Sequence, residues 1–166
     1  SAASDVYKRQ PYISIPDPTA NRALGFLAPE FLSNSRLDFG VKLPFFIPLD
    51  VDKDITFTPF ITPQTSTIET RYRQAFEKGN LNVDSSLTRD TLGDNQFRGY
   101  LSINGDFNLD NGYILNYNIE RVSDSAYLGD YGYTAQNELS SGLNYSQVRS
   151  DSYVETSLGV IQSLYK

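Results

Sequence analysis

The 166-residue sequence contains neither cysteine nor histidine. These two absences exclude disulfides, thiol nucleophiles, zinc sites and imidazole acid–base chemistry within this stretch. Basic residues are also scarce, since the net charge is -6 and no block of Lys and Arg occurs. A nucleic-acid interface needs clustered Lys and Arg, so we expect no nucleic-acid partner. Nothing in the sequence indicates a cofactor or a metal site.

Long apolar runs are missing as well. No segment approaches the roughly 18 to 20 consecutive apolar residues of a membrane-spanning helix, and the N-terminal residues lack the apolar core of a signal peptide. The chain is instead rich in aromatic residues, with 12 Tyr and 10 Phe, although its hydrophobic fraction is only 39%. That composition is typical of a protein built from many strands and turns.

The hexapeptide DVYKRQ, residues 5–10, looks like the translation of a transposon adapter end used in sequencing libraries. We therefore leave residues 1–10 out of the fold prediction and expect the open reading frame to be a fragment. The alternative is an ordinary polar tail, which changes nothing in the predicted fold. Residues 20–32 have some helical character, but Gly25 and Pro29 interrupt it, so an irregular lead-in is expected.

Alternating apolar and polar residues predict an all-β, antiparallel up-and-down meander of about eight strands. The predicted strands are residues 37–49, 54–61, 68–76, 80–87, 97–109, 113–120, 138–146 and 153–160. Asp110, Asn111 and Gly112 give the strongest turn signal, because they supply the positive-φ residues of a tight hairpin.

Alternation alone does not separate a membrane barrel from a soluble β-sandwich. Several predicted strands run about ten residues, enough for a tilted membrane crossing and more than the ~5 to 6 of typical globular strands. Their polar faces suit a hydrated lumen. Aromatic residues near strand ends fit the interfacial girdles of a barrel, namely Phe45, Phe46, Phe97, Phe107 and Tyr113. The pattern therefore favours the membrane barrel.

Five segments carry a resemblance to a known family. They are RALGFLAPEF (22–31), FGVKLPFFIPLDVDKDITFTPFIT (39–62), ETRYRQ (69–74), FRGYLSINGDF (97–107) and RVSDSAYLGDYG (121–132). In order and spacing they resemble LptD, the outer-membrane lipopolysaccharide-assembly family, also called organic solvent tolerance protein. The resemblance implies that residues 11–36 end a periplasmic domain and that residues 37–166 are the first strands of a large transmembrane β-barrel.

The resemblance also implies a function. In that family the barrel inserts lipopolysaccharide into the outer leaflet of the Gram-negative outer membrane through a lateral gate between its first and last strands. Prolines in the first two strands weaken that gate, and Pro44 and Pro59, fifteen positions apart, match the pair. The implied partners are lipopolysaccharide, the plug lipoprotein LptE and the periplasmic bridge protein LptA. The alternative reading of the two prolines is that they mark edge strands or bulges, as in any β protein.

Four basic residues are expected on the lumen side, where they are candidate contacts for lipopolysaccharide phosphates. They are Lys42, Arg71, Arg73 and Arg98. The alternative is that these charges are solvated or paired with Asp and Glu. Asp124 and Asp130 have loose cation-site spacing, but an acidic loop is the simpler interpretation.

Two other functions are consistent with the pattern. An independent eight-stranded outer-membrane barrel with an adhesin or structural role would close its last strand onto its first. A soluble sugar-binding sandwich or glycosidase would need a converging carboxylate pair. Glu69, Asp84, Asp106 and Glu120 lie on predicted polar faces, but nothing singles out two of them. We therefore expect no enzyme activity.

The predicted sidedness contains one conflict. If the first strand rises from the periplasm, the long connection at residues 123–137 falls on the periplasmic side, where outer-membrane barrels normally have short turns.

Overall fold

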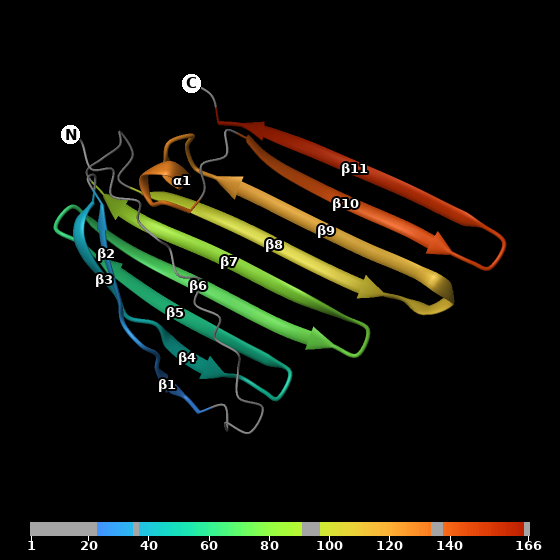
Figure 1. Ribbon diagram of the computed structural model, residues 1–166, viewed down its shortest axis with the longest axis horizontal. Coiled ribbons are helices and arrows are strands. Elements are labelled where there is room, and N and C mark those ends of the chain that lie inside the picture. Colours follow the sequence, from blue (N-terminus) through green and yellow to red (C-terminus); the bar gives the residue numbers. More distant parts are fainter. Residues whose placement is uncertain (1–22, 35–36, 91–96, 134–137, 165–166) are drawn as a thin grey trace, which may run out of the picture.

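The chain forms one antiparallel sheet of 11 strands (Figure 1). The computed structural model describes residues 23–34, 37–90, 97–133 and 138–164, so the segment assigned to a sequencing adapter lies outside the described residues. The strands lie side by side in a single layer, with β1 and β2 at one edge and β11 at the other. No pairing among the described residues joins these two edges, so the sheet is open. The prediction of an all-β antiparallel meander is confirmed.

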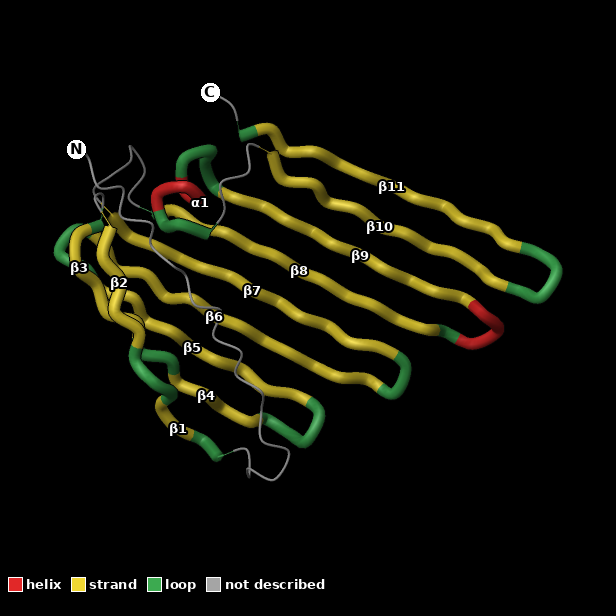
Figure 2. Tube along the Cα trace, viewed as in Figure 1, coloured by secondary structure: helices red, strands yellow, loops and turns green. Residues whose placement is uncertain are grey.

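Figure 2 shows that strands account for most of the described chain. They are β1 (Gly25–Phe26), β2 (Glu30–Asn34), β3 (Asp38–Lys42), β4 (Phe45–Pro48), β5 (Lys53–Ile61), β6 (Thr65–Phe76), β7 (Gly79–Asp90), β8 (Arg98–Asn108), β9 (Tyr113–Val122), β10 (Glu138–Val148) and β11 (Tyr153–Ser163). Two short helical turns, η1 (Asp110–Gly112) and α1 (Tyr127–Asp130), lie in the connections. No helix in the described part of the chain has the length and hydropathy needed to cross a bilayer.

Two predictions for the N-terminal part were wrong. The single strand expected at residues 37–49 is divided into β3 and β4, because the chain leaves the strand conformation at Leu43 and Pro44. The lead-in expected to be irregular contains β1 and β2, which pair with β4 and β3 respectively. Backbone pairing with a neighbour, which local sequence pattern does not encode, gives this segment its strand structure. The other seven predicted strands correspond to β5 through β11.

The sheet has one apolar and one polar face, because residues paired across antiparallel strands point to the same side. One row of paired residues crosses β5 to β9 as Ile55, Tyr72, Val83, Ile103 and Ile119. The next row crosses the same strands on the opposite face as Thr56, Arg71, Asp84, Ser102 and Glu120. The predicted alternation is therefore realised across the middle of the sheet.

The apolar face is largely uncovered by the chain. Leu158 and Val160 of β11 are 67% and 55% exposed, and Ile68, Leu87 and Ile119 also remain open to the surroundings. A soluble β-sandwich covers such a face with a second layer. The described residues supply no second layer on this side.

The polar face is covered at one end by residues 123–133, which we call the plug. It includes α1 and lies over the ends of the strands in Figure 1. The principal buried cluster forms beneath it, combining Tyr127, Leu128 and Tyr131 of the plug with Leu37, Phe60, Val122, Leu139 and Leu164. Strict alternation along the predicted strand 138–146 places Leu139 on the same face as Leu143 and Tyr145, which are uncovered. That grouping was wrong, because the plug packs on Leu139 and leaves it 2% exposed.

Tight turns occupy the opposite end of the sheet, at residues 49–52, 77–78, 109–112 and 149–152 (Figure 2). The turn predicted at Asp110, Asn111 and Gly112 is confirmed, with φ of 59° at Asn111 and 76° at Gly112. Gly112 is also required sterically, since a Cβ at this position would lie 2.1 Å from the Val148 carbonyl oxygen. The tight turns and the plug therefore mark two different ends of the sheet.

Candidate functional site

The N-terminal edge of the sheet is the candidate site, and Pro59 lies at its first interruption. β5 pairs with β3 only at Val41 and Lys42, and resumes pairing with β4 at Phe45. Continuing either register places Leu43 opposite Pro59. The Leu43 N–H donates to the Pro59 carbonyl oxygen at 3.1 Å. The return bond of this pair is absent because proline has no N–H.

Pro44 interrupts the opposite side of the same strand. It lies opposite Thr58 in a position that makes no ladder bonds to β5, so its backbone groups point toward β1. The Leu27 N–H donates to the Pro44 carbonyl oxygen at 2.8 Å. Again the return bond is absent. The two prolines therefore remove one ladder bond on each side of the β3–β4 strand, within two adjacent rows.

The outermost strand is irregular at the same level. Continuing the β1–β4 register places Leu27 opposite Pro44, whereas continuing the β2–β3 register places Pro29 opposite Leu43. One residue, Ala28, is therefore extra and forms a bulge between β1 and β2. Three irregularities in neighbouring strands thus form one line of weak pairing, which we call the proline seam.

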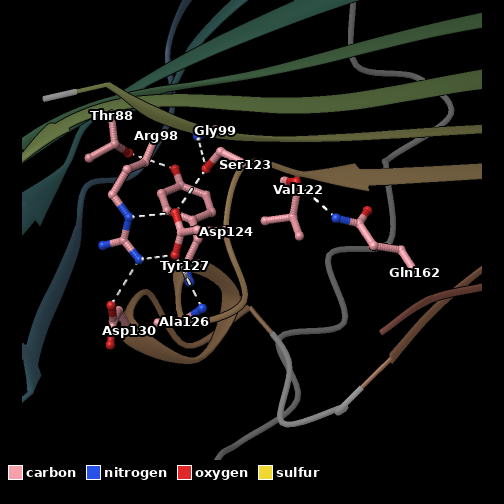
Figure 3. Close-up of polar contacts among 10 residues, drawn as sticks. All are labelled: Thr88, Arg98, Gly99, Val122, Ser123, Asp124, Ala126, Tyr127, Asp130 and Gln162. Carbon is pink, nitrogen blue, oxygen red and sulfur yellow. Dashed lines mark hydrogen bonds and ion pairs between the residues drawn. The ribbon is translucent and has the colours of Figure 1, made fainter. Parts of the chain in front are cut away.

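The plug is anchored by a buried ion-pair network around Arg98 (Figure 3). The Arg98 guanidinium, 3% exposed, binds the Asp124 carboxylate at 2.7 Å and the Asp130 carboxylate at 3.0 Å. Asp124 also accepts hydrogen bonds from the backbone N–H groups of Ala126 and Tyr127 and so shapes the turn that begins α1. Asp124 and Asp130, which were considered as a cation site, are therefore both bound by an arginine from β8.

Tyrosines complete the anchoring of the plug. The Tyr127 hydroxyl is fully buried and lies 2.6 Å from the Thr88 hydroxyl and 3.1 Å from that of Ser86, both on β7. The Tyr131 hydroxyl lies 2.6 Å from the Thr65 hydroxyl on β6. These tyrosines were not predicted from the sequence, because the connection has no alternation that would indicate which side chains are buried. Three Tyr within seven residues was the available signal.

Neighbouring groups and burial set the protonation states of two plug residues, Asp124 and Tyr133. Hydrogen bonds from Arg98 hold the pKa of Asp124 well below its ordinary 3.8, at about 2, so this carboxylate is ionised across the physiological range. Burial, together with the nearby Glu69 carboxylate, raises the pKa of Tyr133. Tyr133 therefore remains a neutral hydroxyl donor.

All four predicted phosphate contacts are ion-paired on the polar face. The pairs are Lys42 with Glu69 (2.6 Å), Arg71 with Asp84 (2.9 Å), Arg73 with Asp54 (2.9 Å), and Arg98 with Asp124 and Asp130. A phosphate would have to compete with these carboxylates. Arg71, whose side chain is 63% exposed, is the most accessible of the four. Contact with lipopolysaccharide phosphates stays a prediction.

The carboxylates considered for a glycosidase are also largely engaged. Lys42 and Tyr133 bind Glu69, Arg71 binds Asp84, and the Asn116 amide donates to Asp106 at 2.8 Å. Further along the same face, an open groove crosses β8 to β11. It is lined by polar side chains that include Asn104, Asn116, Asn118, Asn144 and Ser157. Amides rather than paired charges dominate this part of the polar face.

A scan against protein-family models gave no match to this chain, and a search of curated proteins gave none either. The features that bear on function are therefore the two faces of the sheet, the proline seam and the resemblance of the five sequence segments.

Proposed function

We propose that this chain forms the opening wall of an LptD-type outer-membrane β-barrel, which delivers lipopolysaccharide to the outer leaflet through a lateral gate at the proline seam. The observation that carries the proposal is that two features occur together in one sheet. A wide apolar face is left uncovered, and the prolines that match the family's gate lie at the edge of that same sheet. The polar face would line the lumen and meet the sugars.

The dimensions of the apolar face support a lipid environment. Phe97 lies just before β8, and Phe107 lies within it. Their separation of ten positions corresponds to about 34 Å along a strand. A strand tilt of about 40° reduces this to roughly 25 Å, the height of the apolar band in outer-membrane barrels. Between them on this face, Leu101 and Ile103 are aliphatic, and the remaining two positions, Gly99 and Gly105, carry no side chain. Arg89 lies over the Phe97 ring at 6.0 Å, a contact suited to the membrane interface.

Aromatic residues also gather near the tight-turn ends of the strands. Phe76 at the end of β6 and Phe107 of β8 have ring centroids 5.5 Å apart. Tyr113 of β9 and Tyr145 of β10 are stacked at 5.4 Å. These aromatic contacts, one across β7 at Gly79 and one between the neighbouring strands β9 and β10, resemble one girdle of a membrane barrel.

The free energy lost at the proline seam is of a size suited to gating. Each absent backbone bond is worth about 0.5 to 1.5 kcal/mol net in water, and an unpaired group facing hydrocarbon costs several kcal/mol. Two prolines therefore shift the balance between a closed and a parted seam without preventing the remaining pairs from forming. Lipid A would leave sideways at the N-terminal edge of the sheet, which this seam weakens, and no covalent chemistry is required.

Tryptophan fluorescence tests the lipid-facing assignment, because the chain contains no Trp. Ile103→Trp places a single indole on the apolar face, and the matched control Asn104→Trp places one on the polar face of the same strand. In vesicles whose acyl chains carry bromine, Ile103→Trp should be strongly quenched and Asn104→Trp should not. Equal quenching of the two variants would contradict the membrane placement.

The gate itself is tested in cells. Pro44→Ala combined with Pro59→Ala, placed in a complete lipopolysaccharide-assembly protein, should reduce lipopolysaccharide in the outer leaflet while folded barrel levels stay unchanged. Pro63→Ala is the matched control, because Pro63 is exposed in the turn between β5 and β6 and takes no part in the strand ladder. Normal lipopolysaccharide levels in the double variant would count against the gate.

A further inference from the structure

The proline seam is bridged on the polar face by side chains. The Lys42 ammonium of β3 binds Glu69 Oε1 of β6 at 2.6 Å, and the Tyr133 hydroxyl of the plug donates to the same oxygen at 2.6 Å. The Lys42 and Glu69 side chains are only 15% and 21% exposed. A largely buried, charge-assisted contact is stronger than an exposed ion pair.

The register places this bridge directly over the interruption. Glu69 pairs with Thr58 of β5, and Thr58 lies opposite Pro44 when the β4–β5 register is continued. Lys42 is the last residue of β3 and the last to pair with β5 before the break. The bridge therefore crosses β5 at the level where the backbone ladder has lost its bonds.

Aromatic side chains hold the lysine in position. The Lys42 ammonium lies 5.3 Å from the centre of the Phe60 ring and 5.7 Å from that of Tyr133, both within the range of cation–π attraction. Tyr133 is in turn stacked near Tyr131 at 6.2 Å and near Tyr100 of β8 at 6.0 Å. The position of Tyr133, and with it the bridge, is therefore linked to the anchored plug.

We propose that Lys42, Glu69 and Tyr133 form a latch that holds β3 in the sheet where the prolines remove backbone bonds, so that the plug controls opening of the seam. Breaking the Lys42–Glu69 contact would free β3 while leaving the rest of the ladder paired. In the proposed transporter these three would be positioning residues for the gate. The retention of β3 by the latch can nevertheless be measured without any lipid transport.

Hydrogen exchange on the whole chain in detergent micelles tests the latch. Glu69→Gln keeps the size of the side chain but removes the charge, and should accelerate exchange of the β3 and β4 amides about tenfold. Tyr133→Phe, which removes only one donor, should give a smaller acceleration of the same amides. In both variants the amides of β10 and β11 should exchange as before.

Asp84→Asn is the matched control, because it breaks the Arg71 pair on the same face without a contact to β3. It should leave β3 and β4 exchange unchanged. Lys42→Met provides a second route if Glu69→Gln fails to fold, and combining the two should add nothing beyond either alone. Unchanged β3 exchange in Lys42→Met, or equal acceleration of β3 and β11, would overturn the latch. Loss of the predicted lipid quenching would overturn the membrane proposal alone.

Discussion

The two edges of the sheet are built differently. At the C-terminal edge, β10 and β11 pair over all eleven residues of each strand without interruption. At the N-terminal edge, β4 pairs with β5 over four residues, β3 adds two, and β1 contacts β4 through two. The first edge contains no proline and the second contains four, Pro29, Pro44, Pro48 and Pro59.

The difference shows where the sheet can part. A ladder of consecutive bonds opens only by losing several of them together, whereas the proline seam has already lost two and is supported by side chains instead. Opening is therefore expected at β3 and β4 before any other junction, and the following three changes test that contrast.

The largest effect is expected from placing a proline in the continuous ladder. Leu143 of β10 pairs with Tyr117 on one side and with Leu158 on the other. Leu143→Pro removes a ladder donor from a strand with neighbours on both sides and leaves a carbonyl unpaired, which should cost roughly 3 kcal/mol. Denaturant unfolding in micelles measures the loss. Leu143→Ala is the control, and equal losses in the two variants would show that the backbone bond is unimportant there.

Acid should loosen the plug, and with it the N-terminal edge, before the C-terminal hairpin. The pKa of Asp124 is lowered in the folded chain, so its contribution is fully present above pH 3.8 and is lost as the pH falls toward about 2. A shift of nearly two units corresponds to a contribution on the order of 2 kcal/mol. The free energy of unfolding, measured in steps of about one pH unit from about pH 5 to about pH 2, should show this loss. Asp124→Asn should remove it, and an identical pH profile in that variant would contradict the assignment.

The smallest effect is expected from restoring a donor at the seam. Pro59→Val supplies an N–H opposite the Leu43 carbonyl and a residue that favours strands, so it should stabilise the β3–β5 junction by about 0.5 to 1.5 kcal/mol. Slower hydrogen exchange of β3 amides would report the gain. Pro63→Ala should leave this exchange as it is. Faster exchange in Pro59→Val would mean that the proline ring packs better than a ladder bond.

The strands and turns that depend only on the local residue pattern could be predicted from the sequence. Alternation identified the strands from β5 onward, and Asp110 to Gly112 identified a turn because positive φ is a property of the residues themselves. The break at Leu43 was missed because the apolar alternation of Leu43 and Phe45 continues through it. β1 and β2 were missed because their structure depends on partners distant in sequence.

The candidate site was predictable only in part. Pro44 and Pro59 could be selected through the resemblance to the family's proline pair, but the side of the strand on which each removes a bond depends on the register. The carboxylate partners of Arg98 lie in a connection with no regular pattern, and the carboxylate that binds Lys42 lies on β6, which is separated from β3 by β5. Sequence alone therefore could not indicate that these charges are engaged by the plug and by β6.

The uncovered apolar face has a thermal consequence. In globular proteins, exposing buried apolar surface gives unfolding a heat capacity change of about 12 to 15 cal/mol/K per residue. In this sheet the apolar side chains that meet their own chain are concentrated beneath the plug, and the wide face is in contact with whatever solvent surrounds it. When detergent covers that face in both states, calorimetry should give a much smaller heat capacity change per residue. The stability curve would then be shallow, with little loss of stability on cooling.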